Sequence, residues 1–190
     1  MNYKFIDGGV TSPMGFTAQG VCASIKPSNT TKRDLALIYC DTLCNAAAVF
    51  TKNLVKSDTI AVTKKHLENG KAQAVIVNSG NANTCNADGY EKAEEMCRLA
   101  SEALSVNQDD VIVASTGVIG QVLPIEPVVK GVEMMKGNLS KDGGTNAAEA
   151  IMTTDTVKKE MAMEMVLDGK KVTIGGIAKG SGMIHPNMAT

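Results

Sequence analysis

The residues best suited to chemistry lie in the segment Lys179-Gly-Ser-Gly-Met-Ile-His-Pro-Asn-Met-Ala-Thr190. A threonine hydroxyl is a weak nucleophile unless a base activates it. Cleavage before Thr190 would free an α-amine with an ordinary pKa of about 7.7–8.0, which can act as that base at neutral pH. The hydroxyl could make the cut itself by attacking the Ala189 carbonyl, because nearby glycines tolerate a strained backbone. The pattern indicates a cleavage site and a threonine nucleophile. The alternative is that residue 190 is only the point at which this sequence stops.

A second candidate site is the segment Ser115-Thr-Gly-Val-Ile-Gly120, which directly follows a strand-like run. The hydroxyl of Thr116 and the backbone N–H of Gly117 could form an oxyanion hole, in which two donors point at a developing negative charge. The alternative is an ordinary turn that ends a strand. The residue types alone leave both interpretations open.

Two further groups could bind a substrate: Lys179 and the cluster Thr153-Thr-Asp-Thr156. The Lys179 ammonium, beside a loop of small residues, could hold a substrate carboxylate, or it could be a solvated lysine at a strand end. The threonine cluster with Asp155 is explained equally well by a turn after a helix. The segment around Lys179 is not a phosphate-binding P-loop, because no Lys-Ser or Lys-Thr pair closes a GxxxxG run.

Histidines and cysteines offer little further chemistry. The sequence has two histidines, His66 and His185, and five cysteines, without an HExxH, CxxC or GxSxG motif. We therefore expect no metal site and no Ser-His-Asp triad. We expect His66 to be solvated on a polar helix. The cysteines are expected to be reduced, mostly buried thiols, which favours a cytoplasmic protein.

Composition excludes several function classes. No apolar run reaches the roughly 20 residues that a transmembrane helix needs. A net charge of −1 and an aromatic content of 3% give no indication of binding to nucleic acid or to an anionic membrane surface. The hydrophobic content of 44% is typical of a globular protein.

Short strands and helices that alternate without a strict repeat must position these residues. Strands are expected within 5–26, at 35–40, 46–51, 59–62, 72–77 and 110–115, and as a hairpin of 157–167 and 171–178. Helices are expected at 64–69, from Asp88 to Leu104, from Pro124 to Gly137, and at 146–152. This order predicts an α+β fold with helices packed on a mixed sheet, in a single domain over residues 1–190 without an internal boundary.

Taken together, the motifs resemble the ornithine acetyltransferase (glutamate N-acetyltransferase) family of arginine biosynthesis. Besides the segments above, the matching stretches are Gly8-Gly9-Val-Thr-Ser-Pro-Met-Gly15-Phe16, Val49-Phe50-Thr51-Lys-Asn53 and Asn78-Ser-Gly-Asn-Ala-Asn83. The resemblance implies a layered α/β sandwich of the self-processing, threonine-nucleophile type, similar to aminopeptidase-like enzymes. It also implies that this chain is the N-terminal α half of a precursor, completed by a β chain from the same precursor.

The same resemblance implies an activity and a role for each site residue. The family transfers acetyl from N2-acetyl-L-ornithine to L-glutamate through an acetyl-threonine, in a ping-pong reaction without a cofactor. Bifunctional members also use acetyl-CoA as a donor, and the family forms α2β2 heterotetramers. By motif match, cleavage falls at Ala189-Thr190, the nucleophile is Thr190, the oxyanion hole is Thr116 with Gly117, and substrate contacts come from Thr156, Lys179 and Thr190.

One departure from the family pattern concerns Thr190. In the cleaved form of the family this threonine begins the β chain, whereas here it is the last residue and its nitrogen is in a peptide bond. We therefore expect the 190 residues alone to be inactive. Two alternatives remain: a self-processing aminopeptidase or amidohydrolase of the same fold that uses water as the acceptor, and a non-catalytic binding subunit.

Overall fold

The computed structural model describes residues 3–182, which form seven strands and four α-helices. The strands are β1 (Tyr3–Ile6), β2 (Phe16–Val21), β3 (Leu35–Asn45), β4 (Lys71–Asn78), β5 (Val111–Ser115), β6 (Lys159–Leu167) and β7 (Lys170–Ala178). The helices are α1 (Asp58–His66), α2 (Gly89–Leu104), α3 (Ile125–Met135) and α4 (Gly144–Ala150), with 3₁₀ turns at Leu67–Asn69, Gln108–Asp110 and Lys141–Gly143.

The larger sheet has the strand order β2-β3-β4-β5 and supplies most of the core. Its first three strands are antiparallel neighbours, whereas β4 and β5 run parallel and are joined by the crossover through α2. Successive side chains of a strand point to opposite faces. In β3, Leu35 and Leu37 belong to one apolar cluster, and Ala36 and Ile38 belong to another on the opposite face. The sheet is therefore covered on both sides.

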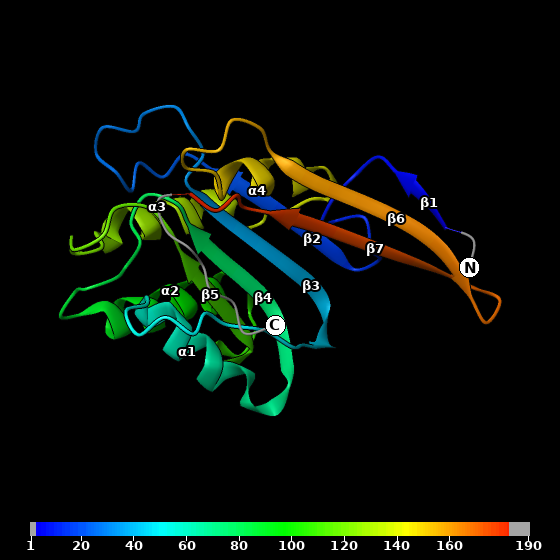
Figure 1. The fold of residues 1–190 in the computed structure, drawn as a ribbon, viewed down its shortest axis with the longest axis horizontal. Coiled ribbons are helices and arrows are strands. Elements are labelled where there is room, and N and C mark those ends of the chain that lie inside the picture. Colours follow the sequence, from blue (N-terminus) through cyan, green and yellow to red (C-terminus); the bar gives the residue numbers. More distant parts are fainter. Residues whose placement is uncertain (1–2, 183–190) are drawn as a thin grey trace.

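Helices α1, α2 and α3 pack on one face of this sheet, as Figure 1 shows. The i, i+3, i+4, i+7 pattern predicted for α2 is confirmed, because Ala93, Met96, Cys97 and Ala100 are fully buried. Burying a side chain of the size of methionine stabilises the fold by about 1.5–3 kcal/mol. Burial also raises the pKa of the Cys97 thiol to about 12, so this cysteine acts as a core residue.

The second sheet, β1-β6-β7, and helix α4 lie toward the opposite face of the larger sheet (Figure 1). Ala147 and Ala150 of α4 join the second apolar cluster, and Ile177 of β7 packs against it. The predicted hairpin is confirmed: β6 and β7 pair over their full length, and Asp168 and Gly169 both have positive φ, at 49° and 75°. These are the backbone angles of a tight two-residue turn. The α+β sandwich expected from the sequence is confirmed.

Two of the expected strands are wrong. The 59–62 stretch is not a strand, because the helix begins at Asp58, with the Ser57 hydroxyl accepting a hydrogen bond from the Thr59 N–H at 3.3 Å. The 46–51 strand fails because β3 continues as far as Asn45, which pairs with Lys71, the first residue of β4. Residues 46–50 run past the end of that partner and have no strand structure.

The expected environments of His66 and of the cysteines are also wrong. His66 is 2% exposed. Its Nδ1 lies 2.8 Å from the Val111 carbonyl oxygen, and its Nε2 lies 3.4 Å from the Glu94 carboxylate. The last turn of α1 presses against β5, so a residue in a polar stretch becomes buried. Of the five cysteines only two are buried, while Cys85 is exposed.

Candidate active site

The predicted oxyanion segment is the turn that follows β5. Because β4 and β5 are parallel, with Asn78 opposite Ser115, their carboxyl ends lie side by side at one edge of the sheet. The backbone N–H of Thr116 donates to the Asn78 carbonyl oxygen at 3.0 Å. This places Thr116, which is half-buried, where loops from two neighbouring strands meet, a common position for binding sites in α/β sheets.

Gly117 has a backbone conformation and a contact that both require glycine. Its φ is 129°, and a Cβ added there would lie 2.7 Å from the Gly80 carbonyl carbon and 2.8 Å from the Asn81 nitrogen. Any other residue would be strained and would collide with the neighbouring backbone. The turn is therefore more constrained than an ordinary strand end.

The segment Asn78-Ser-Gly-Asn-Ala-Asn83 forms the loop beneath this turn. Three of its asparagines are buried, at 0%, 4% and 0% exposure for Asn78, Asn81 and Asn83. Asn78 Oδ1 accepts from the Asn81 N–H at 2.9 Å, and Asn78 Nδ2 donates to the Ser115 Oγ at 2.6 Å. Buried amides are kept in a core when their hydrogen bonds are satisfied. The residue types of this loop predict only a polar turn, and the family resemblance alone singles it out.

The same loop connects the turn to the Thr153-Thr-Asp-Thr156 cluster. The Ser79 Oγ donates to the carbonyl oxygen of Ala150, the last residue of α4, at 2.6 Å. The cluster begins only three residues after Ala150. The structure therefore places Thr153–Thr156 at the same end of the molecule as Thr116 and Gly117.

Lys179 is held by this cluster and is not merely a solvated strand-end lysine. Its Nζ donates to the Thr153 Oγ1 and to the Asp155 Oδ2, each at 2.7 Å, and the Gly180 N–H donates to the other Asp155 oxygen at 2.7 Å. An ammonium group has three N–H donors, so these bonds leave a third for a ligand. Thr156, the last residue of the cluster, is exposed.

Asp155 is the central residue of this cluster, although its sequence context predicts only a turn after a helix. Its side chain is 3% exposed and pairs with Lys179 and, at 2.9 Å, with Lys159. The hydrogen bond from Lys179, followed by the one from Lys159 and those from backbone N–H groups, holds the pKa of the Asp155 carboxyl well below its usual range. Asp155 is therefore a carboxylate at every pH at which an assay is practical.

Replacing Asp155 by asparagine should destabilise the full-length protein by about 1.5–3 kcal/mol, the size of a lost hydrogen bond to a charged group. A depressed folded-state pKa stabilises the fold fully above the unfolded value, near 3.8, and this effect is lost as the pH falls through the folded value. Denaturant unfolding should give a constant difference between wild type and Asp155→Asn from about pH 5 to 8 that shrinks below about pH 4. Asp142→Asn, at an exposed carboxylate, is the control, and an equal loss there would contradict the assignment.

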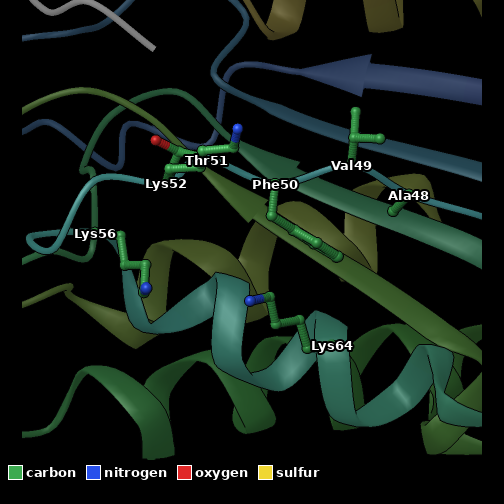
Figure 2. Close-up of a pocket in the computed structure, with 7 residues that line it drawn as sticks. All are labelled: Ala48, Val49, Phe50, Thr51, Lys52, Lys56 and Lys64. Carbon is green, nitrogen blue, oxygen red and sulfur yellow. The ribbon is translucent and has the colours of Figure 1, made fainter. Parts of the chain in front are cut away.

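A basic hollow of about 490 Å³ lies between the 48–52 segment and α1, as Figure 2 shows. Lys52, Lys56 and Lys64 line it together with Thr51 and apolar residues, and no carboxylate of residues 3–182 belongs to its lining. The Lys64 Nζ lies 5.1 Å from the centre of the Phe50 ring, a cation–π contact. Of the predicted site residues that the structure describes, Thr116, Gly117, Thr156 and Lys179, none lines this hollow.

Thr190, Ala189 and His185 lie outside the described residues, and the roles predicted for Thr190 and Ala189 stay predictions. Within residues 3–182, no group of three or more His, Cys, Asp and Glu side chains is arranged to hold a metal ion. Over the same range, no helix is long and apolar enough to cross a membrane.

Comparison with known proteins gives consistent matches over nearly the whole chain. The ArgJ family model matches residues 17–190. The chain is 50% identical over 188 residues to the arginine biosynthesis bifunctional protein ArgJ of Caldanaerobacter subterraneus subsp. tengcongensis, covering 98% of this chain and 46% of that protein. The ArgJ protein of Symbiobacterium thermophilum is also 50% identical, with 98% and 47% covered. The chain thus spans about half the length of these relatives.

Two crystal structures share the fold. The arginine biosynthesis bifunctional protein ArgJ of Bacillus halodurans superposes with a TM-score of 0.92 at 40% identity, covering 99% of this chain and 98% of that one. The ornithine acetyltransferase of Mycobacterium tuberculosis complexed with ornithine superposes with a TM-score of 0.90 at 38% identity, covering 99% and 100%. On the family match and these likenesses, the chain belongs to the ArgJ family.

Proposed function

We propose that this chain is the N-terminal half of an enzyme that transfers acetyl from N2-acetyl-L-ornithine to L-glutamate. The observation that carries the proposal is the match to the ornithine acetyltransferase complexed with ornithine, at 38% identity over the full length of that crystal chain. The glycine-only turn at Gly117 and the anchored ammonium of Lys179 supply the kinds of groups that such a transfer needs. The whole activity belongs to the full-length protein, since the chain spans about half of its relatives.

In the proposed mechanism, cleavage at Ala189-Thr190 frees the Thr190 amine, which serves as the base. The Thr190 hydroxyl attacks the acetyl carbonyl of N-acetylornithine and loses its proton to that amine. The negative oxygen of the tetrahedral intermediate is stabilised by the Thr116 hydroxyl and the Gly117 N–H. The C–N bond then breaks, the proton passes to the departing amine, and ornithine leaves an acetyl-threonine ester. The glutamate amine attacks this ester by the reverse sequence, which yields N-acetylglutamate and restores Thr190.

The proposed substrate contacts follow from the Lys179 cluster. The free N–H of Lys179 binds the substrate carboxylate, with Asp155 fixing the position of the ammonium and Thr156 contributing its hydroxyl. No cofactor is required, because the acetyl group is carried on the threonine oxygen. In a bifunctional enzyme acetyl-CoA would acylate the same oxygen.

The proposed partner is the β half of the same precursor, in an α2β2 assembly. The sheet β1-β6-β7 supports a partner, because one of its faces carries the cross-strand rows Phe5-Met163-Ile174 and Tyr3-Met165-Val172. Phe5 is 62% exposed, Tyr3 59% and Ile174 51%. Exposed apolar patches of this kind mark interaction sites. Two co-eluting fragments from the expressed full-length gene would support this assembly, whereas a lone N-terminal fragment would count against it.

The direct test of the function is ornithine release from N-acetylornithine by the purified full-length protein, with and without glutamate. We expect sustained release only with glutamate, because the acetyl-threonine needs an acceptor amine before a second turnover. Sustained release that ignores glutamate would favour the hydrolase alternative, in which water is the acceptor. No release under either condition would favour the non-catalytic binding subunit.

A further inference from the structure

We propose that Asn81 is a positioning residue for acetyl transfer. It holds both ends of the loop 116–122, and so fixes the two donors of the oxyanion hole at its start. The inference rests on the proposed function, because it assigns to Asn81 the task of placing Thr116 and Gly117. Asn81 itself touches neither substrate nor the reacting atoms.

The backbone of Asn81 pairs with the first half of the 116–122 loop. It forms an antiparallel bridge with Thr116 and a parallel bridge with Val118. The next residue continues the contact, since the Ala82 N–H donates to the Val118 carbonyl oxygen at 2.8 Å. One residue of the 78–84 loop is thus paired with positions on both sides of Gly117.

The side chain of Asn81 holds the far end of the same loop. Its Nδ2 donates to the carbonyl oxygen of Gln121 at 3.0 Å and to that of Val122 at 3.4 Å. Its Oδ1 accepts from the Asn83 N–H at 2.7 Å. The residue is 4% exposed, so the amide is fully used inside the protein, and its role is to shape the loop.

Only an amide satisfies all of these partners. The two carbonyl oxygens need donors, and the Asn83 N–H needs an acceptor on the same planar group. A carboxylate of the same shape keeps the acceptor, loses both donors and turns a negative charge toward two carbonyl oxygens. An oxyanion hole works only when its donors lie about 2.7–3.1 Å from the developing charge. A shift of about 1 Å in such a geometry can cost about 100-fold in rate.

Two other asparagines are controls that distinguish a positioning role of Asn81 from simple stabilisation of the fold. Asn83 is equally buried and lies in the same loop, but its Nδ2 donates to the Gly89 carbonyl oxygen at 2.6 Å, at the start of α2. Asn138 is exposed and donates to the carbonyl oxygens of Met134 and Lys136 at 3.0 Å and 3.4 Å. The hydrogen bonds of the Asn138 amide are therefore as long as those of the Asn81 amide. They lie at the end of α3, in a loop remote in sequence from the candidate site.

The experiment compares Asn81→Asp, Asn81→Ala, Asn83→Asp and Asn138→Asp in the full-length protein. For each variant, kcat and KM for N-acetylornithine with glutamate are measured together with the thermal midpoint. We expect both Asn81 variants to lower kcat by about 100-fold and to change KM by less than about 3-fold, because the substrate contacts at Lys179 are untouched. Asn83→Asp should lower the thermal midpoint with little change in kcat, and Asn138→Asp should change neither much.

The pH dependence of kcat is a second measurement, and a purely structural role of Asn81 would not produce the result expected for it. Protonation of the carboxyl introduced by Asn81→Asp restores one donor, so its kcat deficit should shrink as the pH falls, whereas that of Asn81→Ala should not. Asn81→Ala also covers the case in which the buried charge prevents folding. An active wild type with folded Asn81 variants of normal kcat would overturn the inference and leave the proposed function standing. An inactive wild type would overturn both.

Discussion

Replacing Thr190 by alanine is expected to leave the full-length precursor as one uncut chain and to abolish acetyl transfer. The alanine removes the hydroxyl that attacks the Ala189 carbonyl, and without that cut no free α-amine forms to act as base. Removal of a catalytic nucleophile typically costs a factor of 10⁴ or more in kcat. Both losses follow from one oxygen atom, so they should occur together.

Intact mass and ornithine release measure the two losses of Thr190→Ala. Thr30→Ala, at an exposed threonine, is the control and should behave as wild type. Continued cutting of Thr190→Ala would point to an external protease. Retained transfer in a variant that is not cut would place the nucleophile on another residue.

Gly117→Ala should lower kcat by a factor of about 10²–10³, the cost of losing an oxyanion donor. The added Cβ would lie 2.7 Å from the Gly80 carbonyl carbon, and φ of 129° is unfavourable for alanine. The backbones of Gly117 and Gly80 both belong to well-packed loops. The turn at Gly117 therefore has to move away from the 78–84 loop. That movement displaces the Gly117 N–H and the Thr116 hydroxyl from the reacting carbonyl.

Gly137→Ala is the matched control for this substitution. Gly137 also has a positive φ, 73°, but a Cβ there would meet no atom within 4 Å. Gly137→Ala should lower the free energy of unfolding by about 1 kcal/mol and leave kcat unchanged. Steady-state kinetics and thermal unfolding of both variants separate the loss of kcat from the loss of stability. If Gly117→Ala loses no more activity than Gly137→Ala, the turn is not part of the active site.

Local sequence signals predicted the elements whose structure depends on neighbouring residues. The apolar spacing around Met96 defined α2, and Asp168-Gly169 defined the β6–β7 turn. The failures lie where distant segments decide the outcome. The 59–62 stretch is helical because Thr63 and the rest of that face dock on β5, with the Thr63 Oγ1 donating to the Val113 carbonyl oxygen at 2.8 Å. Propensity is overridden by tertiary contacts of this kind.

In the candidate site, too, local sequence signals predicted some residues, whereas contacts between distant segments decided the rest. Motifs singled out Thr116, Gly117 and Lys179, because glycine turns and ammonium groups have characteristic chemistry. The partners that fix them could not be read from the sequence. Asp155 bonds Lys179 across 24 positions, and Asn81 bonds Gln121 across 40. A sequence gives the donors and acceptors available, whereas only the fold determines which of them meet.

The measurement that tests the central claim most directly is the mass of the fragment that begins at Thr190. The purified full-length protein is mixed with N-acetylornithine in the absence of glutamate, and its fragments are mapped by mass spectrometry. The ping-pong mechanism predicts one acetyl group on Thr190, which disappears when glutamate is added and reappears as N-acetylglutamate. Glutamate-dependent ornithine release without any acetyl on Thr190, or with the acetyl on another residue, would contradict it.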